Sequence, residues 1–344
     1  MADTLRWGII GTGTIAKTFA KGVAASRTGT LVAVGSRDQA TADAFGDAYS
    51  VPRRHASYDA LLADEQVQAV YISTPHPMHA EWAIKAAAAG KHLLVEKPIG
   101  VNAAEAEAIV AAARQHDVFL MEAFMYRCHP QVRTLLDLIR GGAIGTVRVI
   151  QATFGFHAPI PYDPTSRLLS HDLAGGGILD VGCYPASLCR LVAGTAVGQP
   201  FSEPTELVAT GYLGQTGVDE WTVASAKFPG DVVAQLSTGV QCDQENVARI
   251  YGSDGWILVH APWSPSLDGG PSTLVLHRRG QPPETITVAP PAELYALEAD
   301  TVADHLEARQ APSPAMTWDD TLGNMRLLDR WRAAIGLQYG FEGK

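Results

Sequence analysis

A glycine-rich turn near the start of the chain has residue types and spacing that suit a dinucleotide. The segment GTGTIA at residues 11–16 follows an apolar run over residues 5–10 and precedes a helical pattern that ends near residue 25. In such a strand, turn and helix unit Gly11 permits the tight turn, Gly13 lets a pyrophosphate approach the helix N-terminus, and Ala16 allows close packing. The sequence therefore predicts dinucleotide binding, with these expected contacts: Gly11, Thr12, Gly13, Thr14 and Ile15.

The end of the second predicted strand, residues 31–35, indicates which dinucleotide binds. An acid here usually binds the ribose of NAD, whereas an arginine accommodates the 2′-phosphate of NADP. Ser36 and Arg37 at this position favour NADP. NAD stays possible, because Asp38 becomes the ribose acid if the strand ends later; its alternative role is to cap the helix that begins near Gln39.

A third feature is a lysine at the end of a buried strand. The run Leu93-Leu94-Val95 is followed by Glu96-Lys97-Pro98, and proline cannot continue a ladder. Lys97 is thereby placed at the carboxyl end of a strand, the edge where ligands bind in open α/β sheets. A solvated lysine without a function is the alternative for this motif alone.

The fourth feature is an acid and a tyrosine after a triple glycine, in GGGILDVGCY at residues 175–184. If a helix runs from here to about Val192, Asp180 and Tyr184 share one face, with about 5 to 6 Å between their Cβ atoms. The glycines would let the helix start press closely against a ligand. The residues alone favour a helix cap for Asp180 and a half-buried core position for Tyr184.

These residues need a scaffold of alternating strands and helices, which the hydrophobic pattern predicts up to residue 123. Beyond the first two strands we expect helices at 58–63, 79–89 and 103–116, and strands at 69–72, 92–96 and 118–121. Repeated β-α units of this length predict an α/β fold with a parallel, doubly wound Rossmann sheet. The loop STPHPMH at 73–79 then lies on the same edge as Lys97.

After residue 123 the pattern changes to that of an α+β domain. We expect a linker at 123–129, helices at 131–140, 292–307 and 318–335, and strands at 147–155, 207–212, 220–228, 232–239, 248–251, 256–260, 273–278 and 285–288. This run of strands predicts a largely antiparallel sheet with an open face. The expected domains are therefore a Rossmann domain at residues 1–123 and a substrate-binding and dimerisation domain at 124–344.

Composition and charge exclude several classes of protein. The chain has 344 residues, and 26 basic against 36 acidic residues give a net charge of −10. This charge disfavours nucleic acid as a partner. The four cysteines have no zinc spacing and are expected to be reduced thiols. We find neither a signal-peptide pattern nor an apolar stretch long enough to span a bilayer, so we expect a cytoplasmic protein without a membrane partner.

Four segments in order give the chain a family resemblance: GIIGTGTIA, STPHPMHAEWAIKAAAAGKHLLVEKPIGVNAAEAE, MEAFMYRCHP and SRLLSHDLAGGGILDVGCYP. The chain resembles the Gfo/Idh/MocA family of sugar oxidoreductases, and within it dimeric dihydrodiol dehydrogenases, NADP-dependent D-xylose dehydrogenases and glucose-fructose oxidoreductase. The resemblance spans nearly the whole chain. It implies that Lys97 and Tyr184 are catalytic and that Asp180 helps to hold the sugar.

The resemblance also implies further contacts. With the cofactor we expect Thr74, Pro75, His76, His79, Glu96, Lys97 and Arg127, and with the substrate Phe156, His157 and the catalytic residues. The spacing of His76 and His79 also suits a metal, but no third ligand is evident and we expect none. Plainer alternatives are a surface ion pair for Arg127, solvated loop positions for His157 and His171, and a buried structural role for Trp263, which could otherwise stack on a sugar.

Lys97 and Tyr184 suit the oxidation of a hydroxyl group. Nicotinamide takes the hydride, and the protein must remove a proton. A tyrosine has a reference pKa of about 10, and a nearby ammonium group favours its phenolate. We expect Lys97 and Tyr184 to titrate as one coupled pair, and the sequence does not decide which of the two formally accepts the proton.

The expected function is that of an NADP-dependent oxidoreductase acting on a sugar or related polyhydroxy compound, such as D-xylose or D-glucose oxidised at C1 to a lactone. Alternatives with the same machinery are reduction of a keto sugar of the anhydrofructose type and oxidation of a trans-dihydrodiol. A non-catalytic NADP-binding sensor is a different class, but it would not need the pair Lys97 and Tyr184. We expect a homodimer through the C-terminal sheet, because residues 220–228 and 232–240 carry more apolar positions than one covered face needs.

Overall fold

The computed structural model describes residues 4–159, 161–267 and 269–342. The chain forms two compact units. The first contains Met1–Gly100, Ala104–His129 and Pro291–Thr321, and the second contains Val101–Ala103, Pro130–Pro290 and Leu322–Lys344. The expected division at residue 123 omits the return of the chain to the first unit after residue 290. None of the helices in the described part of the chain is long and apolar enough to cross a membrane.

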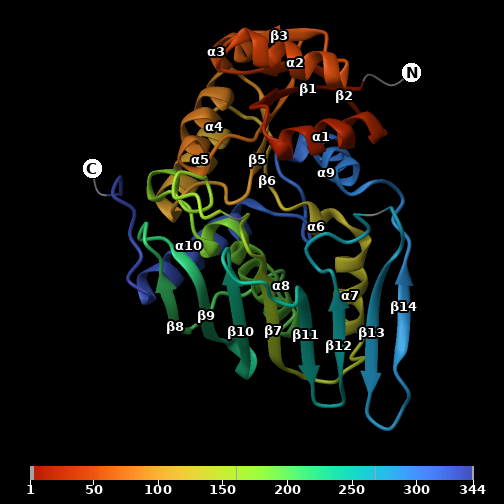
Figure 1. Ribbon diagram of the computed structural model, residues 1–344. Helices are drawn as coiled ribbons and strands as arrows, with labels where there is room; N and C mark the ends of the chain where they lie inside the picture. Colours follow the sequence, from red (N-terminus) through yellow and green to blue (C-terminus); the bar gives the residue numbers. More distant parts are fainter. Residues whose placement is uncertain (1–3, 160, 268, 343–344) are drawn as a thin grey trace. The chain divides into compact units, whose positions relative to one another are not determined.

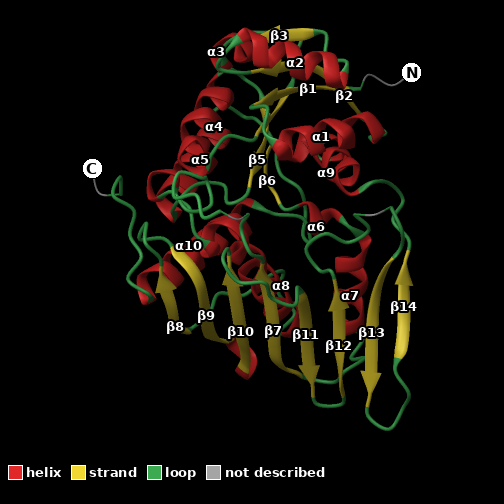
Figure 2. Ribbon diagram, in the orientation of Figure 1, coloured by secondary structure: helices red, strands yellow, loops and turns green. Residues whose placement is uncertain are grey.

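The first unit is built on a parallel sheet with the strand order β3-β2-β1-β4-β5-β6 (Figures 1 and 2). Its strands are β1 (Leu5–Ile10), β2 (Gly29–Gly35), β3 (Arg53–His55), β4 (Ala69–Ile72), β5 (His92–Glu96) and β6 (Leu120–Ala123). Its helices are α1 (Thr14–Ala25), α2 (Gln39–Tyr49), α3 (Tyr58–Leu62), α4 (His79–Ala88), α5 (Ala103–Gln115), α6 (Met125–Cys128) and α9 (Leu294–Asp304). This order confirms the doubly wound sheet, whose β4 and β5 are apolar because helices cover both faces.

One strand of this unit was not predicted, and one was predicted with the wrong bounds. The hydrophobic pattern does not indicate β3, because it is a short edge strand whose residues Arg53–His55 are polar. The strand predicted at 118–121 pairs with β5 two residues later, at Leu120–Ala123. The apolar run does begin at Val118, but it follows a turn at Asp117, where φ is +51°, so the first two residues only lead into the ladder.

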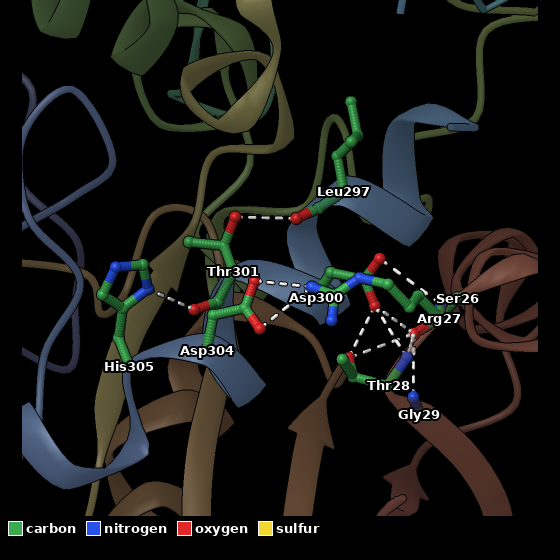
Figure 3. A network of polar contacts seen from close by, with 9 residues as sticks. All are labelled: Ser26, Arg27, Thr28, Gly29, Leu297, Asp300, Thr301, Asp304 and His305. Atoms are coloured by element: carbon green, nitrogen blue, oxygen red, sulfur yellow. Dashed lines mark hydrogen bonds and ion pairs between the residues drawn. The ribbon is translucent and has the colours of Figure 1, made fainter. Parts of the chain in front are cut away.

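Helix α9 joins the first unit through a carboxylate at the loop between α1 and β2 (Figure 3). The side chain of Asp300 accepts hydrogen bonds from Ser26 Oγ at 2.6 Å and from Thr28 N at 3.0 Å. Glycine at position 22 is also required, because a Cβ there would lie 2.4 Å from the Cβ of Tyr295 in α9. These contacts explain why a late segment of the chain belongs to the Rossmann unit.

The second unit contains a largely antiparallel sheet with the order β14-β13-β12-β11-β7-β10-β9-β8 (Figure 2). Its strands are β7 (Val147–Gly155), β8 (Glu206–Leu213), β9 (Asp219–Phe228), β10 (Val232–Gly239), β11 (Val247–Gly252), β12 (Gly255–His260), β13 (Ser272–Arg278) and β14 (Glu284–Val288). Strands β10 and β7 form its parallel pair. Two helices, α7 (Pro130–Arg140) and α8 (Cys183–Ala196), pack on one face, and α10 (Trp318–Ala334) ends the helical part of the chain.

The opposite face of this sheet is open and partly apolar. Along β9 buried and exposed residues alternate, which is the pattern of a sheet with one covered face. Large apolar side chains are nevertheless exposed on neighbouring strands of that face: Val208, Tyr212, Trp221, Val223 and Val233. The prediction of an open-faced sheet is confirmed.

Candidate active site

The glycine turn after β1 leaves room for a ligand where the sequence predicted it. Gly11 has φ of +100°, and a Cβ there would lie 2.9 Å from Ser73 Oγ, so only glycine fits. Gly13 begins α1 without a side-chain cap, and a Cβ built on it meets nothing within 4 Å. The first N–H groups of a helix have no partner within the helix, and the space at Gly13 beside them is open, which fits the pyrophosphate of a dinucleotide.

The three polar residues after β2 differ in their exposure and in their contacts. Asp38 is the N-cap of α2: one carboxylate oxygen accepts Thr41 N and the other accepts Thr41 Oγ1, both at 2.8 Å. These hydrogen bonds lower the pKa of Asp38. Ser36 is buried, whereas Arg37 is exposed. Of the two roles open to Asp38, the structure shows the helix cap.

The loop after β4 is fixed by a histidine inside the protein. His79 is fully buried, and its two ring nitrogens lie 2.9 Å from Pro98 O and 2.8 Å from Thr74 O. Burial lowers the pKa of His79 to about 4, although both carbonyls oppose this shift. The ring therefore braces the loops after β4 and β5 and faces backbone on both nitrogens. Its spacing from His76 could not reveal this, because the two carbonyls come from distant segments.

In the loop after β5, the backbone of Lys97 is held by the side chain of its neighbour Glu96. The Glu96 carboxylate accepts hydrogen bonds from Tyr71 Oη and, at 3.1 Å, from Lys97 N. Lys97 is half-buried, and its charge contributes to the low pKa of His79. Glu122 in β6 accepts Ile99 N at 3.0 Å and holds the next part of the loop. The supporting roles of Tyr71 and Glu122 carried no sequence signal.

Arg127 lies in the interior of the first unit. Its guanidinium donates to Asp320 Oδ2 at 2.6 Å and to the carbonyl of Pro314. Burial lowers the pKa of Arg127, but the interaction with Asp320 raises it, so that the pKa of Arg127 lies above its usual value. The sequence left a cofactor contact and a surface ion pair open; the structure shows an ion pair, and it is buried.

Asp180 and Tyr184 occupy the start of a helical segment in the second unit. The segment begins with a π turn at Ile178–Gly182 and continues as α8 from Cys183. The condition of one α-helix from this point to about Val192 is therefore not met, and the i, i+4 geometry that depends on it does not apply across the wider π turn. Asp180 accepts a hydrogen bond from Arg167 Nη1 at 2.7 Å, and its side chain is 5% exposed. Local widening of this kind is frequent at functional sites.

The phenol ring of Tyr184 is held by two aromatic residues. The ring of Phe154 meets the Tyr184 ring edge-on, with 5.2 Å between the ring centroids, and it stacks on the Trp263 ring with a centroid distance of 5.7 Å. The centroids of the Trp263 and Tyr184 rings are 5.9 Å apart. Trp263 is 2% exposed and donates Nε1–H to Thr153 O at 2.8 Å. Its side chain is thus a buried structural residue, the plainer of the two roles expected from the sequence.

The remaining expected residues lie at the surface or beside the C-terminal segment. Phe156 is half-buried and His157 is exposed, with its Nδ1 2.8 Å from Ala158 O. His171 contacts Gln338 O through Nε2 at 3.0 Å. Within the described ranges no group of three or more His, Cys, Asp or Glu side chains is placed to hold a metal ion.

Comparison with known proteins identifies the family. Residues 5–124 match an oxidoreductase family with an NAD-binding Rossmann fold, and residues 132–258 match the GFO/IDH/MocA C-terminal domain. The chain belongs to the Gfo/Idh/MocA family. It is an NAD(P)-binding oxidoreductase that acts on CH–OH groups, and the resemblance seen in its sequence motifs is confirmed.

Relatives cover almost the whole chain. Mouse (Mus musculus) trans-1,2-dihydrobenzene-1,2-diol dehydrogenase is 32% identical over 97% of this chain and 98% of its own length. A 3-ketoreductase from Actinomadura kijaniata in complex with NADP and TDP-benzene has a TM-score of 0.84 at 27% identity, covering 97% of this chain and 98% of that one. An aldose-aldose oxidoreductase from Caulobacter crescentus complexed with glycerol has a TM-score of 0.84 at 25% identity, covering 96% and 97%.

Proposed function

We propose that the protein transfers a hydride between NADP and a hydroxyl-bearing carbon of a sugar or related polyhydroxy compound. The observation that carries the proposal is the presence of both proton-transfer side chains, Lys97 after β5 and Tyr184 in α8, in a chain of this family. The names of the relatives support the same chemistry, since each describes the interconversion of a hydroxyl and a carbonyl group or the oxidation of an aldose. A sensor would not need this pair.

When bound, the nicotinamide cofactor would accept or supply the hydride, and side chains of this protein would move the proton. The Tyr184 hydroxyl lies on a ring whose orientation Phe154 and Trp263 fix. We propose that Lys97 and Tyr184 handle the proton as one coupled pair, because an ammonium group close to a phenol favours the phenolate. Asp180, paired with Arg167, binds a substrate hydroxyl and aligns the reacting carbon.

The choice of NADP over NAD rests on the residues after β2. Both carboxylate oxygens of Asp38 accept hydrogen bonds from Thr41, so this acid is engaged in capping α2. Arg37 beside it is exposed and suits a 2′-phosphate through charge-assisted hydrogen bonds. NADP in the complex of the solved ketoreductase supports this choice.

For the substrate we propose an aldose such as D-xylose or D-glucose, oxidised at C1 to a lactone. Oxidation of a trans-dihydrodiol is the second candidate, because relatives with that activity in their names cover 97% of this chain. Reduction of an anhydrofructose-type keto sugar by NADPH uses the same groups in reverse. The test is NADPH absorbance with aldoses, ketoses and trans-dihydrodiols, in both directions and with NAD in parallel. Binding of NADP without turnover of any compound would favour the sensor.

We also propose a homodimer that forms through the open face of the sheet in the second unit. Monomeric proteins rarely expose neighbouring large apolar side chains on one flat surface. On this face Tyr212 and Trp221 stack with 4.4 Å between their ring centroids, and the Val223 and Val233 side chains are more than two-fifths exposed. The two-fold related copy of the same face is a partner of matching chemistry. The mass in solution by light scattering tests the proposal.

A further inference from the structure

Asp219, at the start of β9, is a buried carboxylate to which the sequence drew no attention. It is fully buried, and its Oδ2 accepts a hydrogen bond from Ile178 N at 2.7 Å. Its other oxygen, Oδ1, has no hydrogen-bond partner among the residues that the structure describes. Burying a carboxylate is unfavourable, and burial outweighs the groups that favour its charge, so a role in stability alone does not account for Asp219.

The carboxylate of Asp219 packs directly against the triple glycine that precedes Asp180. Gly176 has φ of +112°, and a Cβ there would lie 2.1 Å from Asp219 Oδ1. A Cβ at Gly177 would lie 3.2 Å from Asp219 Oδ2 and 3.1 Å from the Cα of Gly239. The sequence suggested that these glycines make room for a ligand. In the structure, Gly176 and Gly177 make room for Asp219.

Two other side chains hold the same turn through its carbonyl groups. Tyr339 Oη donates to Gly175 O at 2.6 Å, and Thr238 Oγ1 donates to Gly177 O at 3.1 Å. Asp219 therefore completes a clamp that comes from β9, β10 and the C-terminal segment. It is the acceptor in this clamp and the one carboxylate among the three side chains.

The charge of Asp219 changes near neutral pH. Burial raises the pKa of Asp219 to about 7, although the N–H groups of Ile178 and Gly177 and the charge of Arg332 act in the opposite direction. Tyr339, which also faces Asp219, keeps its proton because burial and the charge of Asp219 raise its pKa. An ionised carboxylate is a stronger acceptor than a protonated one, so the hydrogen bond from Ile178 N strengthens as Asp219 loses its proton, although burial makes the charge itself unfavourable.

We propose that Asp219 is a positioning residue for the reaction: its carboxylate fixes the π turn that begins at Ile178 and thereby the placement of Asp180 and of the Tyr184 hydroxyl. This inference rests on the proposed function, which gives Tyr184 the proton and Asp180 the substrate. A displacement of about 1 Å in a reacting group can reduce turnover about a hundredfold. The clamp therefore acts on catalysis through Asp180 and Tyr184, without contacting the substrate.

The test is Asp219→Asn, which keeps the size of the side chain and an acceptor for Ile178 N but removes the charge. With NADP and D-xylose, or the best substrate of the panel, we expect kcat at pH 8 to fall about tenfold or more. We expect kcat of the wild type to rise as Asp219 ionises near pH 7, and this rise should be absent in Asp219→Asn. The Kd for NADP should stay within about twofold, because the glycine turn that binds it lies in the other unit.

Thr238→Val is the matched comparison, because it removes a different hydrogen bond from the same turn. It should lower kcat while leaving the pH dependence near pH 7 in place. Wild-type kcat and pH profile in Asp219→Asn would overturn the proposal, and so would a loss of the pH 7 transition in Thr238→Val.

Hydrogen exchange gives a measurement that does not depend on turnover. In Asp219→Asn the peptide covering residues 175–184 should exchange faster, while peptides of the Rossmann sheet remain unchanged. If the wild type neither oxidises nor reduces any compound of the panel, the proposed function fails. Hydrogen exchange alone then tests whether Asp219 holds the π turn. Unchanged exchange in residues 175–184 would overturn it.

Discussion

The indole of Trp263 and the phenol of Tyr184 meet edge to face, with 5.9 Å between the ring centroids. Phe154 contacts both rings, so the three form one aromatic cluster. Each such pair contributes about 0.5 to 1.5 kcal/mol beyond the burial of its area. The orientation of the Tyr184 ring therefore depends on packing. Its hydroxyl can be removed by mutation without loss of these ring contacts.

Tyr184→Phe should thus remove the proton path and keep the structure. We expect kcat to fall by about a hundredfold to ten-thousandfold, the usual range for a positioned general base. The Tm should change little, and the Kd for NADP should be unchanged. The measurement is NADPH absorbance with the best substrate of the panel, with thermal unfolding as the control. Near-normal turnover would rule out Tyr184 as the acid or base.

Lys97→Met tests whether Lys97 and Tyr184 act together. Its loss of kcat should be comparable to that of Tyr184→Phe, and the double variant should be little worse than either single variant, because residues that act as a unit are not additive. Steady-state kinetics of the four proteins give the coupling directly. Losses that simply multiply in the double variant would contradict a coupled pair.

Arg37→Ala should weaken NADP binding and leave NAD binding nearly unchanged. Removing a charge-assisted contact costs about 1.5 to 3 kcal/mol, so we expect the Kd for NADP to rise roughly tenfold to a hundredfold. Fluorescence titration of both cofactors measures the effect. Asp38→Ala is the control: it removes the cap of α2 and should lower the stability of the protein, but it should preserve the preference for NADP. Equal losses for both cofactors in Arg37→Ala would show that Arg37 acts elsewhere.

The sequence predicted elements well where a single local rule decides them. The run before Pro98 ends a buried strand at Glu96 because proline cannot continue the ladder, and the alternation along β9 reports one covered face. Contacts between residues far apart in the sequence produce no local pattern and were not predicted. Examples are the contact of the His79 ring with Pro98 O and the packing of Asp219 against Gly176. Local patterns therefore sufficed to name candidate site residues, whereas the residues that support them became visible only in the structure.

Trp221→Glu tests the proposed dimer through the open sheet face. A carboxylate at the centre of an apolar interface would be buried without a partner, which costs several kcal/mol. Light scattering at micromolar concentration should then give the mass of one chain, 36.6 kDa, in place of twice that value for the wild type. Leu267→Glu is the matched control, because Leu267 is an exposed apolar residue outside the strands of the sheet. A wild-type mass near that of one chain would contradict the dimer.

The stability of the protein should depend on pH through Asp219. The pKa of its carboxyl group is about 7 in the folded protein and about 3.9 in an unfolded chain, so the folded state binds the proton more tightly. The stability that Asp219 contributes is therefore fully present below about pH 4 and is lost as the pH rises through 7. Asp219→Asn has no proton to lose at this position. Its free energy of unfolding, relative to the wild type, should increase between pH 4 and 8, by on the order of 2 to 4 kcal/mol. Urea unfolding at several pH values measures this difference, and a difference that stays constant over this range would contradict the raised pKa. A variant that is relatively more stable at pH 8 and yet turns over more slowly would show that the carboxylate serves the placement of Asp180 and Tyr184.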